Sequence, residues 1–300
     1  MKRSDRGAGD AAAVVLIHGA WHGAWCWQRV ADALAAAGVS AVAVDLPGHG
    51  DSSEPLGDLH ADADLVTSVL DSLDRPAVLV GHSYGGAVIT DAGRHPAVAH
   101  LVYISALALD EGESCVNAAS AEAAATGLSH EGRPDLGAGF VPGDDGTVTI
   151  DPHVARECFY HDCDPATADW AVGKLGPQRL TSLQQEPREV AWRHRSSTYV
   201  VCANDQASHP GLQRLLARRC TSSLEWPTGH SPFLSRPGQV VGLLLGLAFG
   251  RRLPSTIDHR RDPPSFPGFE EPRRRGPHIR ESTGVNPIRP ARGAGPVQPP

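Results

Sequence analysis

The chain has 300 residues, of which 41% are hydrophobic and 20% charged, which is typical of one large α/β domain or two small domains. The formal net charge is −7 at pH 7, and no basic stripe is interleaved with aromatic residues, so the composition argues against a nucleic-acid partner.

Residues 11–105 alternate short apolar runs with helical patterns. Buried strands are expected at Ala11–Ile17, Val39–Val44, Ala77–Val80 and Leu101–Ser105. Helices are expected at Ala24–Ala37, Asp64–Leu73 and Tyr84–Arg94. Regular alternation of this kind predicts a mostly parallel, doubly wound sheet.

Residues 106–196 lose this rhythm, because Gly, Pro and Asp become frequent and apolar residues form only short patches. We interpret this segment as a lid with its own short helices, inserted over the carboxyl edge of the sheet. The alternative is a long surface excursion. A structureless loop of about 90 residues is uncommon inside a compact domain, so the lid is favoured.

The alternation returns at residue 197. Strands are expected at Thr198–Cys202 and Ser222–Trp226, with helices at Pro210–Arg219 and Gln239–Phe249. The predicted core therefore comprises residues 11–105 and 197–250.

The two ends of the chain differ in composition from this core. Residues 1–10 are polar and are expected to be a flexible N-terminus. Residues 251–300 are rich in Arg and Pro without periodicity, which predicts a disordered tail. Ten arginines and five acidic residues give the tail a net +5 and leave −12 on the rest. Such a tail could contact nucleic acid or acidic membranes, although a solvated tail without a partner is the commoner outcome.

The six cysteines have no C-x-x-C spacing, so neither a zinc site nor a redox motif is indicated and free thiols are expected. No signal-peptide pattern is present at the start, and no run approaches the roughly 18 apolar residues of a membrane span. We therefore expect a cytoplasmic protein.

The sequence Gly81-His82-Ser83-Tyr84-Gly85 follows the third predicted strand and precedes a helix. It has the G-x-S-x-G form of a nucleophile elbow, in which a strained turn exposes the serine and the close backbone leaves no room for side chains at the glycines. The alternative is a glycine-rich turn whose serine merely caps the helix.

A serine nucleophile needs a histidine base oriented by a carboxylate, and in open α/β sheets these follow the serine in the order acid, then histidine. Asp205 and His230 satisfy that order, and each follows a predicted strand. Asp205 alone could instead form an Asx turn, and His230 alone could be an exposed loop histidine. The rival acid is Asp110, and the rival bases are His161 and His209.

An acyl-transfer site also needs donors for the developing oxyanion. One is the backbone N–H of Tyr84 after the nucleophile, and Ala20 in the loop after the first strand is our choice for the second. The side chains of His18 and His49 are expected to have structural roles. His82 is interpreted as a neighbour of the nucleophile that points away from the side chain of Ser83 and does not act as the base.

Four motifs, HGAWHGAWCW, DLPGHGDS, GHSYGG and PTGHSPFLSRP, resemble the α/β-hydrolase superfamily. The nearest likeness is to small bacterial esterases akin to the plant methylesterase, salicylate-binding and hydroxynitrile lyase branch. The likeness spans Val14 to Phe249, and FYHDCDP resembles the lid segment of the bacterial members. It implies an α/β-hydrolase fold, the triad Ser83, Asp205 and His230, an oxyanion hole at Ala20 and Tyr84, and no metal or organic cofactor.

Departures from related patterns narrow this expectation. The dehalogenases and epoxide hydrolases of the superfamily have aspartate at the elbow, where this chain has Ser83. The hydroxynitrile lyases have threonine in place of Gly19 and lysine in place of Ser231. Without that lysine no charge stabilises a cyanide leaving group, so ester hydrolysis is favoured. Tyr84 replaces the usual Leu or Met and is expected to add a phenol near the pocket.

The sequence thus predicts a serine esterase acting on carboxylic esters of small molecules. The same triad serves thioesterases, lactonases and biosynthetic cyclases, and a non-catalytic receptor for a small ligand can use the same fold; these alternatives stay open. Five aromatic residues are candidates to line the pocket, with simple lid core as the alternative: Trp21, Phe140, Phe159, Tyr160 and Trp170.

Overall fold

The structure is a computed structural model that describes residues 11–120, 124, 127 and 131–251. The chain divides into two units, Met1–Pro267 and Gly268–Pro300, and all the described residues belong to the first. The expected flexible N-terminus, residues 1–10, lies outside the described residues, as does the expected tail beyond Arg251.

A six-stranded parallel sheet forms the centre, in the order β2-β1-β3-β4-β8-β9. The strands are β1 (Ala13–Ile17), β2 (Ala41–Val44), β3 (Ala77–His82), β4 (Val98–Ile104), β8 (Ser197–Cys202) and β9 (Ser222–Trp226). Strands β1, β3 and β8 are buried along their whole length, as expected for apolar runs covered on both faces. The predicted parallel sheet is confirmed, and each predicted strand is present within a few residues.

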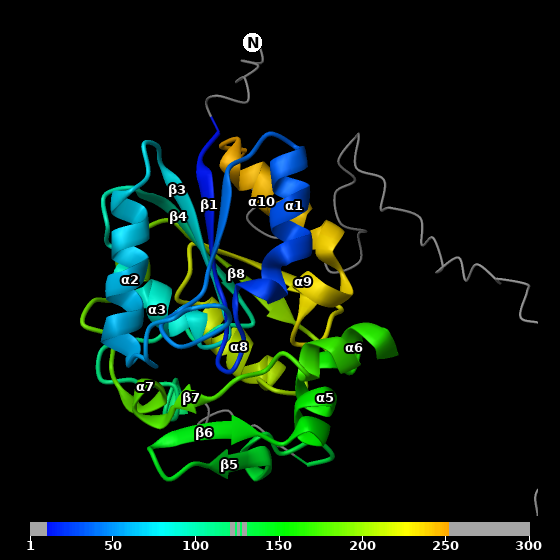
Figure 1. Ribbon diagram of the computed structural model, residues 1–300. Coiled ribbons are helices and arrows are strands. Elements are labelled where there is room, and N and C mark those ends of the chain that lie inside the picture. Colours follow the sequence, from blue (N-terminus) through cyan, green and yellow to red (C-terminus); the bar gives the residue numbers. More distant parts are fainter. Residues whose placement is uncertain (1–10, 121–123, 125–126, 128–130, 252–300) are drawn as a thin grey trace, which may run out of the picture. The chain divides into compact units, whose positions relative to one another are not determined.

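Helices cover both faces of this sheet (Figure 1). Helices α1 (Gln28–Ala36) and α10 (Pro237–Ala248) pack together on one side, whereas α2 (Leu59–Asp71) and α3 (Gly85–Ala92) pack together on the other. Helix α8 (Pro210–Ala217) packs on β8. The short elements of this core are η2 (Ala24–Trp27) and α9 (Pro232–Ser235).

The strand order reverses direction beside β1. The chain places β2 on one side of β1 and then crosses to place β3 on its other side, after which β4, β8 and β9 extend outward. In open α/β sheets, ligands bind beyond the carboxyl ends of the strands at such a switch point. The loops that follow β1 and β3, which contain Ala20 and Ser83, meet there.

Helix α2 differs from the prediction. It begins at Leu59, after Asp58 caps it by accepting a hydrogen bond from Ala61 N–H at 2.9 Å, and it ends at Asp71. The residues that carry the predicted helical pattern over 64–73 lie on a half-exposed face of α2. The buried face is instead Leu59, Asp62, Ala63, Val66 and Leu70, so the carboxylate of Asp62 interrupts the apolar stripe.

The segment between β4 and β8 forms several short elements beyond the carboxyl ends of the core strands (Figure 1). Strands β5 (Phe140–Pro142), β6 (Thr147–Ile150) and β7 (Gln178–Arg179) make an antiparallel sheet. The helical elements are η3 (Gly137–Gly139), α5 (Pro152–Tyr160), α6 (Pro165–Val172), α7 (Leu180–Gln184) and η4 (Ala191–Arg193). Short helices were expected here, but the sheet was not.

All six cysteines lie within the described residues and are free thiols. Within the described part of the chain, no helix is both long enough and apolar enough to cross a bilayer.

Candidate active site

Ser83 occupies a sharp turn between β3 and α3. Its φ is +51°, a left-handed conformation that is strained for a non-glycine residue. A Cβ at Gly81 would overlap the carbonyl group of Gly85, and a Cβ at Gly85 would lie 2.6 Å from the carbonyl oxygen of His18. Both glycines are therefore required by close backbone packing, as the elbow motif predicts. Tyr84, not Ser83, occupies the position before α3.

The left-handed conformation recurs at the neighbouring strand ends. Trp21, in the loop after β1, has φ +64°, and Ser105, directly after β4, has φ +45°. Strained backbone of this kind costs on the order of 1–3 kcal/mol per residue and is concentrated at functional sites. Three such residues follow the adjacent strands β1, β3 and β4.

His230 and Asp205 are joined by a hydrogen bond from Nδ1–H of the imidazole to Oδ2 of the carboxylate, at 2.8 Å. His230 is 2% exposed and Asp205 is fully buried, so His230 is not an exposed loop histidine. Asp205 also makes the Asx turn, because its Oδ1 accepts from Ala207 N–H at 2.7 Å and Ser208 N–H at 2.9 Å. Gln213 Nε2 donates to the same Oδ2 as His230, at 2.8 Å.

Ser105 joins this pair and was not singled out from the sequence. Its buried hydroxyl donates to Asp205 Oδ2, and Oγ lies 3.2 Å from His230 Nδ1. The carboxylate thus receives hydrogen bonds from both side chains. The available signal was its position at the end of a predicted strand, on the edge where Ser83 and Asp205 also lie.

His230 lies beside the elbow through His82. The ring centroids of these two histidines are 4.6 Å apart, and His82 Nε2 is 3.0 Å from the carbonyl oxygen of His230. Phe159 stacks on His230 at 5.4 Å. Among the described residues, none forms a hydrogen bond with Nε2 of His230. Nε2 of His230 can therefore form a hydrogen bond with a group other than Asp205.

The loop that carries His230 is also held by the inserted segment. Asp162 Oδ2 accepts hydrogen bonds from Gly229 N–H at 2.8 Å and from Ser235 Oγ at 2.9 Å. A carboxylate of residues 106–196 thereby fixes both sides of the His230 turn.

The loop after β1 packs against the nucleophile. A Cβ at Gly19 would lie 3.0 Å from Ser83 Cβ and 2.9 Å from His82 Nδ1. His18 fixes the loop as expected, since its Nδ1–H donates to Gly19 O at 2.8 Å and its Nε2 accepts from Leu46 N–H at 3.1 Å. In the described part of the chain, no protein acceptor takes the backbone N–H of Ala20 or of Tyr84.

The phenol of Tyr84 points to Asp62 and not to solvent. Tyr84 is 1% exposed, and its hydroxyl donates to Asp62 Oδ2 at 2.5 Å. Burial raises the pKa of Asp62 to about 7, although the hydrogen bond from Tyr84 acts in the opposite direction. The Oδ1 atom of Asp62 is buried and has no partner among the described residues. The phenol therefore anchors the residue after the nucleophile to α2.

Three of the aromatic pocket candidates gather near His230. The ring centroid of Trp21 is 5.3 Å from that of Phe140 and 5.9 Å from that of Phe159. Tyr160 is buried, and its hydroxyl lies 2.8 Å from His22 Nε2. Trp170 is instead 44% exposed and packs edge-on against Trp25.

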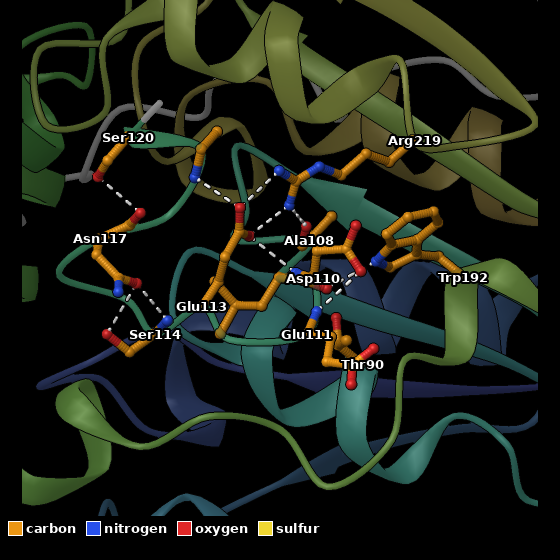
Figure 2. Close-up of polar contacts among 12 residues, drawn as sticks. Thr90, Ala108, Asp110, Glu111, Glu113, Ser114, Asn117, Ser120, Trp192 and Arg219 are labelled. Atoms are coloured by element: carbon orange, nitrogen blue, oxygen red, sulfur yellow. Dashed lines mark hydrogen bonds and ion pairs between the residues drawn. The ribbon is translucent and has the colours of Figure 1, made fainter. Parts of the chain in front are cut away.

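The rival acid and base residues have other partners. The carboxylate of Asp110 pairs with Arg193, and its backbone N–H donates to Glu113 at 2.8 Å. Glu113 in turn binds Arg219 at 2.5 and 2.7 Å (Figure 2). His209 caps α8, where its Nδ1 accepts from Gly211 N–H. His161 ends α5.

Burial favours the neutral form of three histidines around the elbow, His18, His22 and His82. Desolvation lowers the pKa of His22 to about 4 and lowers the pKa values of His18 and His82 well below their usual range. The neighbouring imidazoles act in the same direction. Over the described residues, no group of three or more His, Cys, Asp or Glu side chains is arranged to hold a metal ion.

Comparison with known proteins places this geometry in context. The model of the alpha/beta hydrolase family matches residues 14–243. The alpha/beta hydrolase nvfD of Aspergillus novofumigatus (strain IBT 16806) is 28% identical over 253 residues, covering 79% of this chain and 96% of its own length. The carbendazim hydrolyzing esterase of Nocardioides sp. (strain SG-4G) is 27% identical, covering 78% of this chain and 98% of its own length. Methylesterase 17 of Arabidopsis thaliana is 28% identical, covering 78% of this chain and 90% of its own length.

Solved structures agree in fold. The pyrethroid hydrolase of Sphingobium faniae JZ-2 superposes with a TM-score of 0.68 at 23% identity, covering 80% of this chain and 98% of its own. Polyneuridine aldehyde esterase gives a TM-score of 0.66 at 19% identity, covering 79% of this chain and 99% of its own. With a family match over 14–243 and this six-stranded parallel sheet, the chain belongs to the α/β-hydrolase family.

Proposed function

We propose that the protein is a serine hydrolase that cleaves carboxylic esters of small molecules. The observation that carries the proposal is the buried hydrogen bond between His230 Nδ1 and Asp205 Oδ2, at 2.8 Å, beside a strained elbow serine at φ +51°. Membership of the α/β-hydrolase family and the esterases among its relatives support it.

In the proposed reaction, His230 Nε2 takes the proton of Ser83 Oγ while that oxygen attacks the ester carbonyl carbon. Asp205 holds the Nδ1–H tautomer and stabilises the imidazolium. The carbonyl oxygen becomes an oxyanion that accepts hydrogen bonds from the N–H groups of Ala20 and Tyr84. His230 then donates its proton to the leaving alcohol.

The second half of the reaction uses the same residues. His230 removes a proton from water, the water oxygen attacks the acyl-enzyme on Ser83, and the carboxylic acid leaves as Oγ regains its proton. Trp21, Phe140 and Phe159 supply an apolar surface for the substrate next to His230.

The test is hydrolysis of short p-nitrophenyl esters by wild type and Ser83→Ala, with folding checked by circular dichroism. We expect the variant to lose several orders of magnitude in kcat/KM and to remain folded. Equal rates would overturn the proposal. A panel that adds thioesters and lactones assigns the acyl group, and a receptor without turnover would leave every substrate of the panel intact in wild type.

A further inference from the structure

Gln178, on β7 of the inserted segment, is a fully buried polar residue with three hydrogen-bond contacts. Its Oε1 accepts from Trp21 N–H at 3.2 Å and lies 3.0 Å from His49 Nε2. Its Nε2 donates to Ser182 Oγ at 2.7 Å. A buried amide satisfied on both sides fixes the groups it contacts, because breaking any one contact leaves a desolvated partner.

The inserted segment holds Trp21 at three points. Besides Gln178, Gly176 N–H donates to Trp21 O at 2.8 Å, and Trp21 Nε1–H donates to Val148 O on β6 at 2.9 Å. Trp21 has φ +64°, which a bulky side chain adopts only where the surroundings compensate the strain. Residues 146–182 supply those contacts, so they keep the backbone of Trp21 in this conformation.

This backbone carries the proposed oxyanion donor of Ala20. The peptide between Ala20 and Trp21 is fixed at both ends, since its carbonyl oxygen lies 2.7 Å from His22 Nδ1 and its N–H donates to Gln178. The preceding peptide, which bears the Ala20 N–H, is fixed by His18 through Gly19 O. The core thus orients the peptide that bears the donor, whereas the core and the inserted segment together orient the next peptide.

We propose that Gln178 is a positioning residue that holds the Ala20 N–H in the oxyanion hole through the backbone of Trp21. This inference rests on the proposed function. It makes the inserted segment part of the catalytic machinery, because β6 and β7 hold the backbone of Trp21, which directly follows the peptide that carries the second oxyanion donor. The hydrogen bond between Gln178 and Trp21 thus stabilises the transition state and does not contribute to substrate binding.

The main test variant is Gln178→Met, which keeps an unbranched side chain of similar size and removes both hydrogen-bonding groups. The matched control is Gln184→Met, which makes the same change at an exposed position of α7, in the same inserted segment. Both are compared with wild type on a p-nitrophenyl ester and for affinity toward a trifluoromethyl ketone, which forms an oxyanion on the serine.

Loss of a whole oxyanion donor costs about 10²- to 10³-fold in kcat, so misplacing one is expected to cost about 10- to 100-fold. We expect Gln178→Met to lower kcat by this factor with KM within about threefold, and to weaken the ketone by the same factor as kcat/KM. Gln184→Met should stay within about threefold of wild type. An unchanged kcat, or a higher KM with unchanged ketone affinity, would overturn the inference.

If Gln178→Met does not fold, Trp21→Phe provides the second test. It replaces the indole by a smaller aromatic ring and removes the Nε1–H bond to Val148 O, which is one of the three contacts that hold Trp21. We expect a several-fold loss in kcat and a loss of ketone affinity that matches the loss in kcat/KM. Unchanged values would contradict the inference. Failure of the proposed function is distinguishable, because wild type itself would then neither hydrolyse esters nor bind the ketone covalently.

Discussion

The Asp62→Asn substitution tests the electrostatics beneath the elbow. Asp62 is buried, accepts a hydrogen bond from the Tyr84 phenol at 2.5 Å, and has a pKa raised to about 7 by burial. Asparagine keeps the size and the acceptor for the phenol but cannot ionise. The substitution therefore removes the titration and preserves the contact that anchors Tyr84 to α2.

The sign and size of the effect follow from proton linkage. Between its ordinary pKa of 3.8 and about 7, the Asp62 carboxyl binds more protons in the folded chain than in the unfolded chain. Its contribution to the free energy of unfolding is therefore fully present below pH 3.8 and is lost as the pH rises through 7. Between pH 5 and pH 8 the loss is about 2.5 kcal/mol.

The assay is urea unfolding of wild type and Asp62→Asn at pH 5, 6, 7 and 8. We predict that the difference in unfolding free energy, variant minus wild type, rises by about 2.5 kcal/mol across this range. Titration of the buried histidines cancels in that difference. Asp64→Asn removes an exposed carboxylate of the same helix that pairs with Arg188, and it controls for the loss of one negative charge. A flat difference for Asp62→Asn would refute the reasoning.

Substitutions at three further positions test the site itself. Asp205→Asn should lower kcat/KM for a p-nitrophenyl ester by about 10³- to 10⁴-fold, because the Nδ1–H tautomer of His230 loses its acceptor; a loss below tenfold would count against Asp205 as the acid. Ser105→Gly removes the hydroxyl donor to that carboxylate and should lower kcat/KM several-fold, because the Asp205 and His230 side chains lose a buried hydrogen-bonding neighbour; unchanged kinetics would contradict this. It should also be more stable to urea than Ser105→Ala by about 1 kcal/mol, since only glycine adopts φ +45° without strain. Gly19→Ala places a Cβ 3.0 Å from Ser83 Cβ and should lower kcat at least tenfold, whereas wild-type kinetics would show that the loop can move aside.

The core strands were predictable because they are short apolar runs separated by clear turn residues. Runs such as Ala13–Ile17 and Ala77–His82 are buried on both faces, so their hydrophobicity alone marks them. The elbow was predictable for a related reason, since the glycines at 81 and 85 are required by backbone contacts within a few residues. Contacts between residues that are close in the sequence can therefore be recognised from the sequence alone.

The small sheet was not predictable because its strands are only two to four residues long and pair across gaps of sequence. Phe140–Pro142 pairs with Thr147–Ile150, which in turn pairs with Gln178–Arg179. Strands this short carry too few positions for a period of two to stand out. Their pairing depends on tertiary contacts.

The polar residues that support the site were missed for the same physical reason. Gln178, Ser105 and Asp62 are buried by segments distant in sequence, and in the sequence they look like surface residues. Ser105 left a signal through its position at the end of a predicted strand, and Asp62 left one because it falls on the stripe formed by Leu59, Ala63, Val66 and Leu70. An acidic residue on the apolar face of a predicted helix indicates either that the buried face has been assigned wrongly or that the carboxylate itself is buried.

The measurement that tests the central claim most directly is active-site labelling with a fluorophosphonate, followed by peptide mapping by mass spectrometry. The serines near the His230 and Asp205 pair include Ser83 on the elbow and Ser105, which is in hydrogen-bond contact with both. We predict one phosphonyl group per chain, on Ser83, with ester hydrolysis lost in proportion to labelling. Label on Ser105, or full hydrolysis by a chain that takes no label at Ser83, would contradict the account.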